Sequence, residues 1–339
     1  MSIPVPFSIL DLAHIGDNQS VQQAMAKSQA IAALAENSGY ERLWLAEHHG
    51  MRGVASAATS TLLANLGAIT SKIRLGAGGV MLPNHSPLVV AEQYGTLDAL
   101  YPGRIDLGLG RAPGTDQKTS KALRRDLHSN VSDYPADIQL LQHYFSNDSG
   151  DAQVLAVPGA GSHVPLYLLG SSLYSAQLAG QLGLPFTFAS HFAPEALFDA
   201  INIYKTNFRP SDQLDKPYII AGVMAVVADT EEQAAYHFSS VQQQFANLRR
   251  GANAPMPAPV EDIYAHLSEA EVQTINRTLR YAVNGTPDKV ESQLQNFVES
   301  TGVDELILSF PIYDDNQCLA AIQKVGDMTS VKAPASWQA

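Results

Sequence analysis

Residues 73–114 read IRLGAGGVMLPNHSPLVVAEQYGTLDALYPGRIDLGLGRAPG, and this stretch decides the fold. Ile73 to Gly76 is short, apolar and β-branched, which is typical of a strand buried on both faces. From Pro87 to Tyr101 apolar residues recur at helical spacing, and a proline is tolerated in the first helical turn. Tyr101 to Arg104 has turn composition, and apolar residues alternate again from Ile105 to Leu109. A strand, a crossover helix and a second strand of this length predict a parallel βαβ unit.

Glycines gather where both strands of this unit are expected to end, and Arg111 follows the second strand. Glycine there lets a ligand approach the backbone, and a guanidinium binds phosphate or carboxylate through two parallel hydrogen bonds. Gly78 and Gly79 are either a flexible strand exit or a strained peptide held against a planar ligand. Arg111 binds an anion or forms a structural ion pair. The stretch therefore predicts one wall of a ligand site.

The rest of the chain alternates strand and helix patterns in the same way. Eight such alternations in a chain of 339 residues favour a (β/α)8 TIM barrel with insertions over an open doubly wound sheet. We expect one domain over residues 1–328 and a C-terminal tail over 329–339. The expected strands cover residues 7–12, 41–46, 73–76, 105–109, 165–169, 185–189, 218–227 and 303–310.

Composition excludes several classes of protein. The net charge of −12 without a basic run argues against nucleic acid or an anionic membrane as a partner. The N-terminus lacks a basic region followed by a long apolar run, so neither a signal peptide nor a membrane anchor is expected. The single cysteine, Cys318, fits a reducing compartment. We expect a cytoplasmic protein.

Suggestive polar residues follow the expected strands, which is where barrel enzymes place their active sites. Adjacent residues at a strand end point in different directions, so at most one of His48 and His49 faces the barrel axis. The sequence holds no HExxH or CxxC pattern, and no metal site is predicted. His48 is either a catalytic group or a histidine hydrogen bonded in a helix cap. The residues placed after strands are His14, His48, Gly78, Gly79, Arg111, Ser171, Ser172 and His191.

Gly170, Ser171 and Ser172 lead into a helix and form a candidate phosphate cradle. Backbone N–H groups, hydroxyls and the positive end of the helix dipole converge there. A serine that only caps the helix is the simpler interpretation. Because the fourth and fifth strands are neighbours in a barrel, Arg111 and these serines are expected to bind one phosphate together.

At these residues the chain resembles the bacterial luciferase-like flavin monooxygenases, in a subgroup that does not emit light. The likeness extends over roughly residues 7 to 310. The motifs that carry it are LAEHHG, LGAGGVMLPNHSP, VAEQYGTLDALYPGRIDLGLGRAPGTD, LGSSLYSAQLAGQLGLPFTFASHF and NGTPDKV.

The resemblance implies a TIM barrel that uses reduced FMN and assigns roles to residues by position. His48 matches the family's catalytic histidine, and Gly78 with Gly79 match a pair joined by a cis peptide against the flavin ring. Arg111 matches the phosphate-binding arginine. Gly110 stands where luciferase has a reactive cysteine, so light emission is not expected. The matching phosphate turn consists of Gly170, Ser171, Ser172 and Ser175, and the substrate pocket of His14, His191 and Phe192.

The implied activity is oxygenation of a small organic substrate such as an aldehyde, ketone or sulfonate, with O₂ and through a peroxyflavin. The implied partner is a separate NAD(P)H:flavin reductase, and the implied assembly is a homodimer. Two alternatives stay open, namely hydride transfer with a deazaflavin and flavin binding without catalysis. Asn253 to Asn284 is the expected lid over the barrel mouth.

Overall fold

Eight parallel strands close into a barrel in the computed structural model, which describes residues 2–112, 114–123, 133–147 and 153–333. Neighbouring strands follow chain order from β1 to β7, and β9 lies between β7 and β1 and completes the ring. The barrel strands are β1 (Phe7–Asp11), β2 (Arg42–Leu45), β3 (Arg74–Met81), β4 (Ile105–Gly110), β5 (Leu166–Gly170), β6 (Phe186–Phe188), β7 (Ile219–Val227) and β9 (Glu305–Ser309). The predicted TIM barrel is confirmed.

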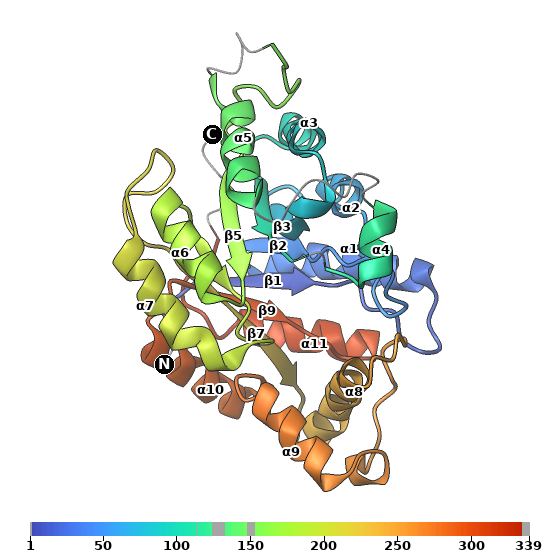
Figure 1. Cartoon of the computed structure of the whole chain (residues 1–339). Helices are drawn as coiled ribbons and strands as arrows, with labels where there is room; N and C mark the ends of the chain where they lie inside the picture. The colour runs from blue at the N-terminus through green and yellow to red at the C-terminus, as the bar shows by residue number, and fades with distance from the viewer. Residues whose placement is uncertain (1, 113, 124–132, 148–152, 334–339) are drawn as a thin grey trace.

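Helices surround the strands (Figure 1). Helix α1 begins with a capping box, in which the side chains of Ser20 and Gln23 each accept the backbone N–H of the other. The helix is capped at its end by Gly39 in a left-handed conformation. The helices are α1 (Val21–Ser38), α2 (Thr59–Gly67), α3 (Pro87–Leu100), α4 (Gln117–Leu123), α5 (Tyr134–Phe145), α6 (Leu173–Leu182), α7 (Leu197–Asn207), α8 (Glu231–Arg249), α9 (Glu269–Thr278), α10 (Pro287–Thr301) and α11 (Asp315–Gly326). Short 3₁₀ turns occur at η1 (Leu82–Asn84), η4 (Pro194–Ala196) and η5 (Ile263–Ala265).

Two details differ from the sequence expectation. Strand β3 continues to Met81, so Gly78 and Gly79 lie inside it, where its pairing with β4 shifts register. The physical reason is close approach, because a Cβ on Gly79 would lie 2.7 Å from the carbonyl oxygen of Gly108. A further strand, β8 (Val283–Gly285), pairs with the far end of β7 outside the barrel. Its three residues form no apolar run by which sequence could reveal it.

The amino-terminal end of the barrel interior holds a buried ion network. Arg42 donates to Glu305 from Nε at 2.9 Å and to Asp106 from a terminal nitrogen at 2.7 Å. Asp106 also accepts hydrogen bonds from Arg74 Nε at 2.9 Å and Trp44 Nε1 at 3.0 Å. Burial alone would raise the pKa of Asp106, but the two guanidiniums hold that pKa below its ordinary value. Since barrel enzymes place their chemistry at the opposite end, this network serves stability.

Apolar packing divides into two parts. A large cluster fills the space between strands and helices, and a smaller one fills the barrel interior above the ion network. The interior cluster consists of Leu10, Trp44, Ala46, Tyr167, Ile220 and Ile307. Side chains at the carboxyl ends of the strands therefore rest on a packed floor.

The described residues after Met328 are hydrogen bonded to the beginning of the chain. Thr329 Oγ1 donates to the carbonyl of Val5 at 2.7 Å, and the N–H of Ser330 donates to the carbonyl of Ile3 at 3.2 Å. The end of the expected tail, residues 334–339, lies outside the described residues. In the described part of the chain, every helix is too short or too polar to cross a membrane.

Candidate active site

Three histidines lie just beyond the carboxyl ends of their strands. His14 follows β1, His48 follows β2 and His191 follows β6. Burial, with the charges of Lys27 and His48, lowers the pKa of His14 to about 4. Burial also lowers the pKa of His191 to about 4, and that of His48 below its ordinary value. All three imidazoles are therefore neutral at pH 7 and able to accept or pass on a proton.

These histidines share an unusual hydrogen-bonding state. The Nδ1 atom of His48 is buried and has no hydrogen-bond partner among the described residues, and those of His14 and His191 are buried and make no hydrogen bond of good geometry there. A backbone interaction with Gly53 raises the pKa of His14, and one with Gly222 that of His191, against the larger effect of burial. The hydroxyls of Thr187 and Ser309 are also buried, and they too have no hydrogen-bond partner among the described residues. Both hydroxyls face the barrel interior, because the residues flanking each in its strand pack in the outer core. Buried polar atoms without partners are costly, so this end of the barrel is suited to a polar ligand that satisfies them.

A missing side chain makes room for His191. A Cβ on Gly222, in β7, would lie 2.3 Å from Nδ1 of His191, so the imidazole occupies space that any other residue would fill. The neighbouring Phe192 is 54% exposed. The structure thus places His191 against the barrel wall and leaves Phe192 at the surface.

Gly78 and Gly79 are joined by a cis peptide bond, as the resemblance implied. A Cβ on Gly78 would lie 2.8 Å from Leu10 and 3.0 Å from Trp44, both of the interior cluster. The pair therefore lies against the packed floor of the barrel, in the strand next to the one that His48 follows.

Arg111 and the turn before α6 form a candidate anion site. The guanidinium of Arg111 lies 4.4 Å from the ring centre of Tyr174, in the first turn of α6. Ser172 is the N-cap of that helix and accepts the N–H of Ser175 at 3.4 Å, so its hydroxyl has the capping role that was the simpler interpretation. Ser171 is exposed beside it. A guanidinium next to a helix N-terminus is an arrangement that binds phosphate.

Gly170 and Ser175 fit each other closely. A Cβ on Gly170 would lie 2.4 Å from the buried side chain of Ser175, which packs under the turn. Ser175 is therefore placed to support the turn. Its hydroxyl lies 3.2 Å from that of Ser172.

The first part of the expected lid is hydrogen bonded across the barrel mouth. Met256 donates its N–H to the carbonyl of Ile15 at 2.8 Å, in the loop after β1. The amide of Asn253 donates to the carbonyl of Gly50 at 2.7 Å and accepts the N–H of Arg52 at 2.8 Å. These bonds tie this segment to the two loops that carry His14 and His48.

A separate cluster lies beside His48 in the sequence. Oε1 of the buried Glu47 is 2.8 Å from Nε2 of His49 and 2.7 Å from Nε2 of His85. The sequence has no metal motif around His49, and no pattern in it marks His85, which lies in the loop after β3. The structure brings these three ligand-type side chains together.

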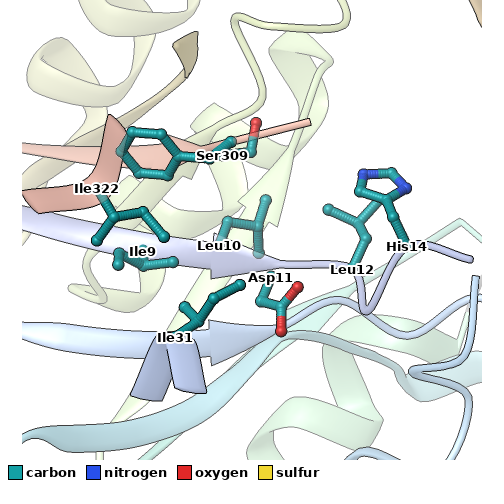
Figure 2. Close-up of a pocket in the computed structure, with 9 residues that line it drawn as sticks. Ile9, Leu10, Asp11, Leu12, His14, Ile31, Ser309 and Ile322 are labelled. Carbon is teal, nitrogen blue, oxygen red and sulfur yellow. The ribbon is translucent and has the colours of Figure 1, made fainter. Parts of the chain in front are cut away.

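A small pocket lies between β1 and β9 on one side and α1 and α11 on the other. It encloses about 10 Å³, roughly the space of one water molecule. Figure 2 shows His14 beyond the end of β1, at the edge of this pocket and away from Ile9 and Ile31. The pocket is too small for an organic substrate.

The sequence did not reveal three contributors to the site. Tyr174 stacks on Arg111, and Thr187 and Ser309 add unpartnered hydroxyls. In the sequence, Thr187 and Ser309 are marked only by being polar residues within apolar strands, Phe-Thr-Phe for Thr187 and Leu-Ile-Leu-Ser-Phe for Ser309.

The chain matches a known protein family over most of its length. The model of the luciferase-like monooxygenase family matches residues 5–305. The chain belongs to this family. The luciferase-like monooxygenase of Escherichia coli K12 is 47% identical over 96% of this chain and 97% of its own. The N-acetyl-S-alkylcysteine monooxygenase of Bacillus subtilis is 31% identical over 91% of this chain and 93% of its own.

Solved structures of the family's fold agree with the barrel. The structure of apo-MsnO8 superimposes with a TM-score of 0.85 at 32% identity and covers 96% of this chain and 98% of its own. Two structures at 15% and 16% identity, each with a TM-score of 0.70, share the fold alone. One is the oxygenating constituent of 3,6-diketocamphane monooxygenase in complex with FMN, and the other an F420-dependent secondary alcohol dehydrogenase in complex with an F420-acetone adduct.

Proposed function

We propose that this luciferase-like monooxygenase binds reduced FMN at the carboxyl end of its barrel and oxygenates a small organic substrate with O₂. The observation that carries the proposal is the pairing of an anion site with a group of buried, unpartnered polar atoms at the same barrel end. A flavin phosphate fits the first, and a flavin ring with substrate fits the second.

The residues that would hold the flavin divide by chemistry. Arg111 and the N-terminus of α6 would bind its phosphate, with Tyr174 keeping the guanidinium in place. The flat surface of the Gly78–Gly79 peptide, which carries no side chain, would face the ring. When bound, reduced FMN supplies the electrons that activate O₂.

His48 would be the residue that transfers protons. Its Nδ1 is buried and unpartnered, and burial keeps the imidazole neutral, so it is free to hold or donate a proton next to bound substrate. His14 and His191 interact electrostatically with His48 and would line the substrate space with it, and the exposed Phe192 would lie at the rim of that space. Neutral imidazoles suit an uncharged polar substrate, such as an aldehyde or ketone, better than a sulfonate, which carries a negative charge.

Two partners complete the proposal. Reduced FMN would come from a separate NAD(P)H:flavin reductase, since the glycines of residues 108–114 do not have the spacing of a dinucleotide fingerprint. A homodimer would form over α2 and α3, where exposed apolar side chains include Val89 and Leu100 of α3 and Ile69 just after α2.

Oxygen consumption tests the reaction class. The protein is mixed anaerobically with reduced FMN or with reduced F420, oxygenated buffer is added, and O₂ uptake is followed with a panel of aldehydes, ketones and sulfonates. The proposal predicts that, with reduced FMN and O₂, a substrate of the enzyme gives an oxygenated product and water in place of hydrogen peroxide. Reduction of an aldehyde or ketone by reduced F420, with oxidation of the F420 and without O₂ uptake, would replace it with hydride transfer. Flavin binding without any product over the panel would favour a flavin-binding protein.

A further inference from the structure

We propose that Glu47, His49 and His85 form a binding site for one divalent transition-metal cation of the Zn²⁺ or Co²⁺ type. The ligand atoms are Oε1 of Glu47 and Nε2 of both histidines, and all three lie within 4.8 Å of one another. None of these three residues has a role in the proposed flavin site, which uses Arg111, Gly78 and His48 instead.

The donor set suits such a cation. Two imidazole nitrogens and one carboxylate oxygen are ligands that zinc and other first-row divalent ions accept, and three protein ligands leave positions open to water. The present N–O separations of 2.7 and 2.8 Å are hydrogen-bonding distances. Tetrahedral ligands about 2.0–2.1 Å from zinc lie about 3.3 Å apart, so the side chains need to open by about 0.5 Å.

The exposure of the three side chains permits this small movement. Glu47 is 2% exposed and stays fixed, whereas His49 is 14% and His85 30% exposed. His85 closes the 3₁₀ turn after β3, through a backbone bond to Leu82 of 2.9 Å. Rotation of its side chain, which has the most solvent around it, would open the cluster and leave an approach for the ion.

The ligands stand on well-supported backbone. Oε2 of Glu47 accepts the N–H of Met81 at 3.3 Å, which orients the carboxylate. His49 donates its N–H to the carbonyl of Gly114 at 3.4 Å, and its own carbonyl accepts Thr115 Oγ1 at 2.7 Å. Loops after β2, β3 and β4 thus meet at the cluster, and such outer contacts are what hold metal ligands in place.

Cobalt binding tests the site. Chelator-treated, metal-free protein is titrated with Co²⁺ and followed by visible absorption and calorimetry, and its melting temperature is measured with and without Zn²⁺. We expect one Co²⁺ per chain with a ligand-field spectrum, and a higher melting temperature with Zn²⁺. His85→Ala and Glu47→Gln should each weaken Co²⁺ binding at least tenfold, whereas His266→Ala, at an exposed histidine, should leave it unchanged.

Two results would overturn the site. One is the absence of Co²⁺ binding by wild type, which would make the cluster a hydrogen-bond network only. The other is full Co²⁺ binding by both His85→Ala and Glu47→Gln, which would move the ion to other histidines. Reduced-FMN binding by His85→Ala is measured in parallel. Because Arg111 lies outside the cluster, loss of the metal with retained FMN binding separates this inference from the proposed function.

Discussion

Replacing Asp106 by asparagine should destabilise the barrel strongly, because this carboxylate joins two buried arginines. It accepts hydrogen bonds from Arg42, Trp44 and Arg74, and its side chain is fully buried. Asparagine keeps one acceptor oxygen but turns an NH₂ group toward guanidinium donors. Arg42 would still pair with Glu305, but the balance of charge around Arg74 would be lost.

Breaking a buried ion pair by removing one partner costs about 3–5 kcal/mol of unfolding free energy. For a chain of this size each kcal/mol lowers the melting temperature by about 2 °C, so Asp106→Asn should melt roughly 6–10 °C below wild type. The matched control is Asp229→Asn, which removes an exposed pair with Lys324 and should cost at most about 1 kcal/mol. Thermal unfolding followed by circular dichroism compares the two. Equal melting temperatures for both variants would show that the network adds little stability.

The other predictions concern the active-site end of the barrel. His48→Ala should lower turnover by about 10²–10⁴-fold at unchanged affinity for reduced FMN, as measured by steady-state kinetics and anaerobic titration; wild-type turnover would remove His48 from the mechanism. Gly222→Ala should displace His191, because the new Cβ would lie 2.3 Å from Nδ1. We expect a loss of about 1–3 kcal/mol of unfolding free energy and a raised KM. An unchanged KM would argue against His191 as a pocket residue. The pKa of His14 and of His191 in the folded protein is about 4, below the ordinary value of 6.5. Between these two pH values the unfolded chain therefore binds more protons than the folded one. The free energy of unfolding should fall as the pH drops from about 6.5 to 4. Urea unfolding over this range should show a flatter pH dependence for His191→Asn, and an identical one would contradict the assignment.

The sequence predicted the barrel because its strands are short apolar runs separated by helical patterns. Buried parallel strands have this composition, and the eight expected strands all lie in the barrel. It could not give the extent of β3, because glycines inside a strand read as a strand end unless the close approach of β4 is known. It could not give β8 either, since the three residues Val283–Gly285 are too few to show an apolar pattern.

Part of the candidate site was also predictable. His14, His48, Arg111 and His191 follow strands, and parallel strands bring such residues to one end of a barrel. The contact of His85 with Glu47 was not predictable, because it depends on how the loop after β3 folds back toward β2. The same is true of Tyr174, whose place beside Arg111 depends on how β4 and α6 pack.

The affinity for reduced FMN tests the central claim most directly. Anaerobic titration would compare wild type with Arg111→Ala and with Arg209→Ala, an exposed arginine between α7 and β7 at the opposite end of the barrel. We predict that wild type and Arg209→Ala bind reduced FMN equally well. Arg111→Ala should bind at least tenfold more weakly, because loss of a charge-assisted hydrogen bond costs about 1.5–3 kcal/mol. Equal affinity in all three proteins would contradict a phosphate site at Arg111 and, with it, the proposed position of the flavin.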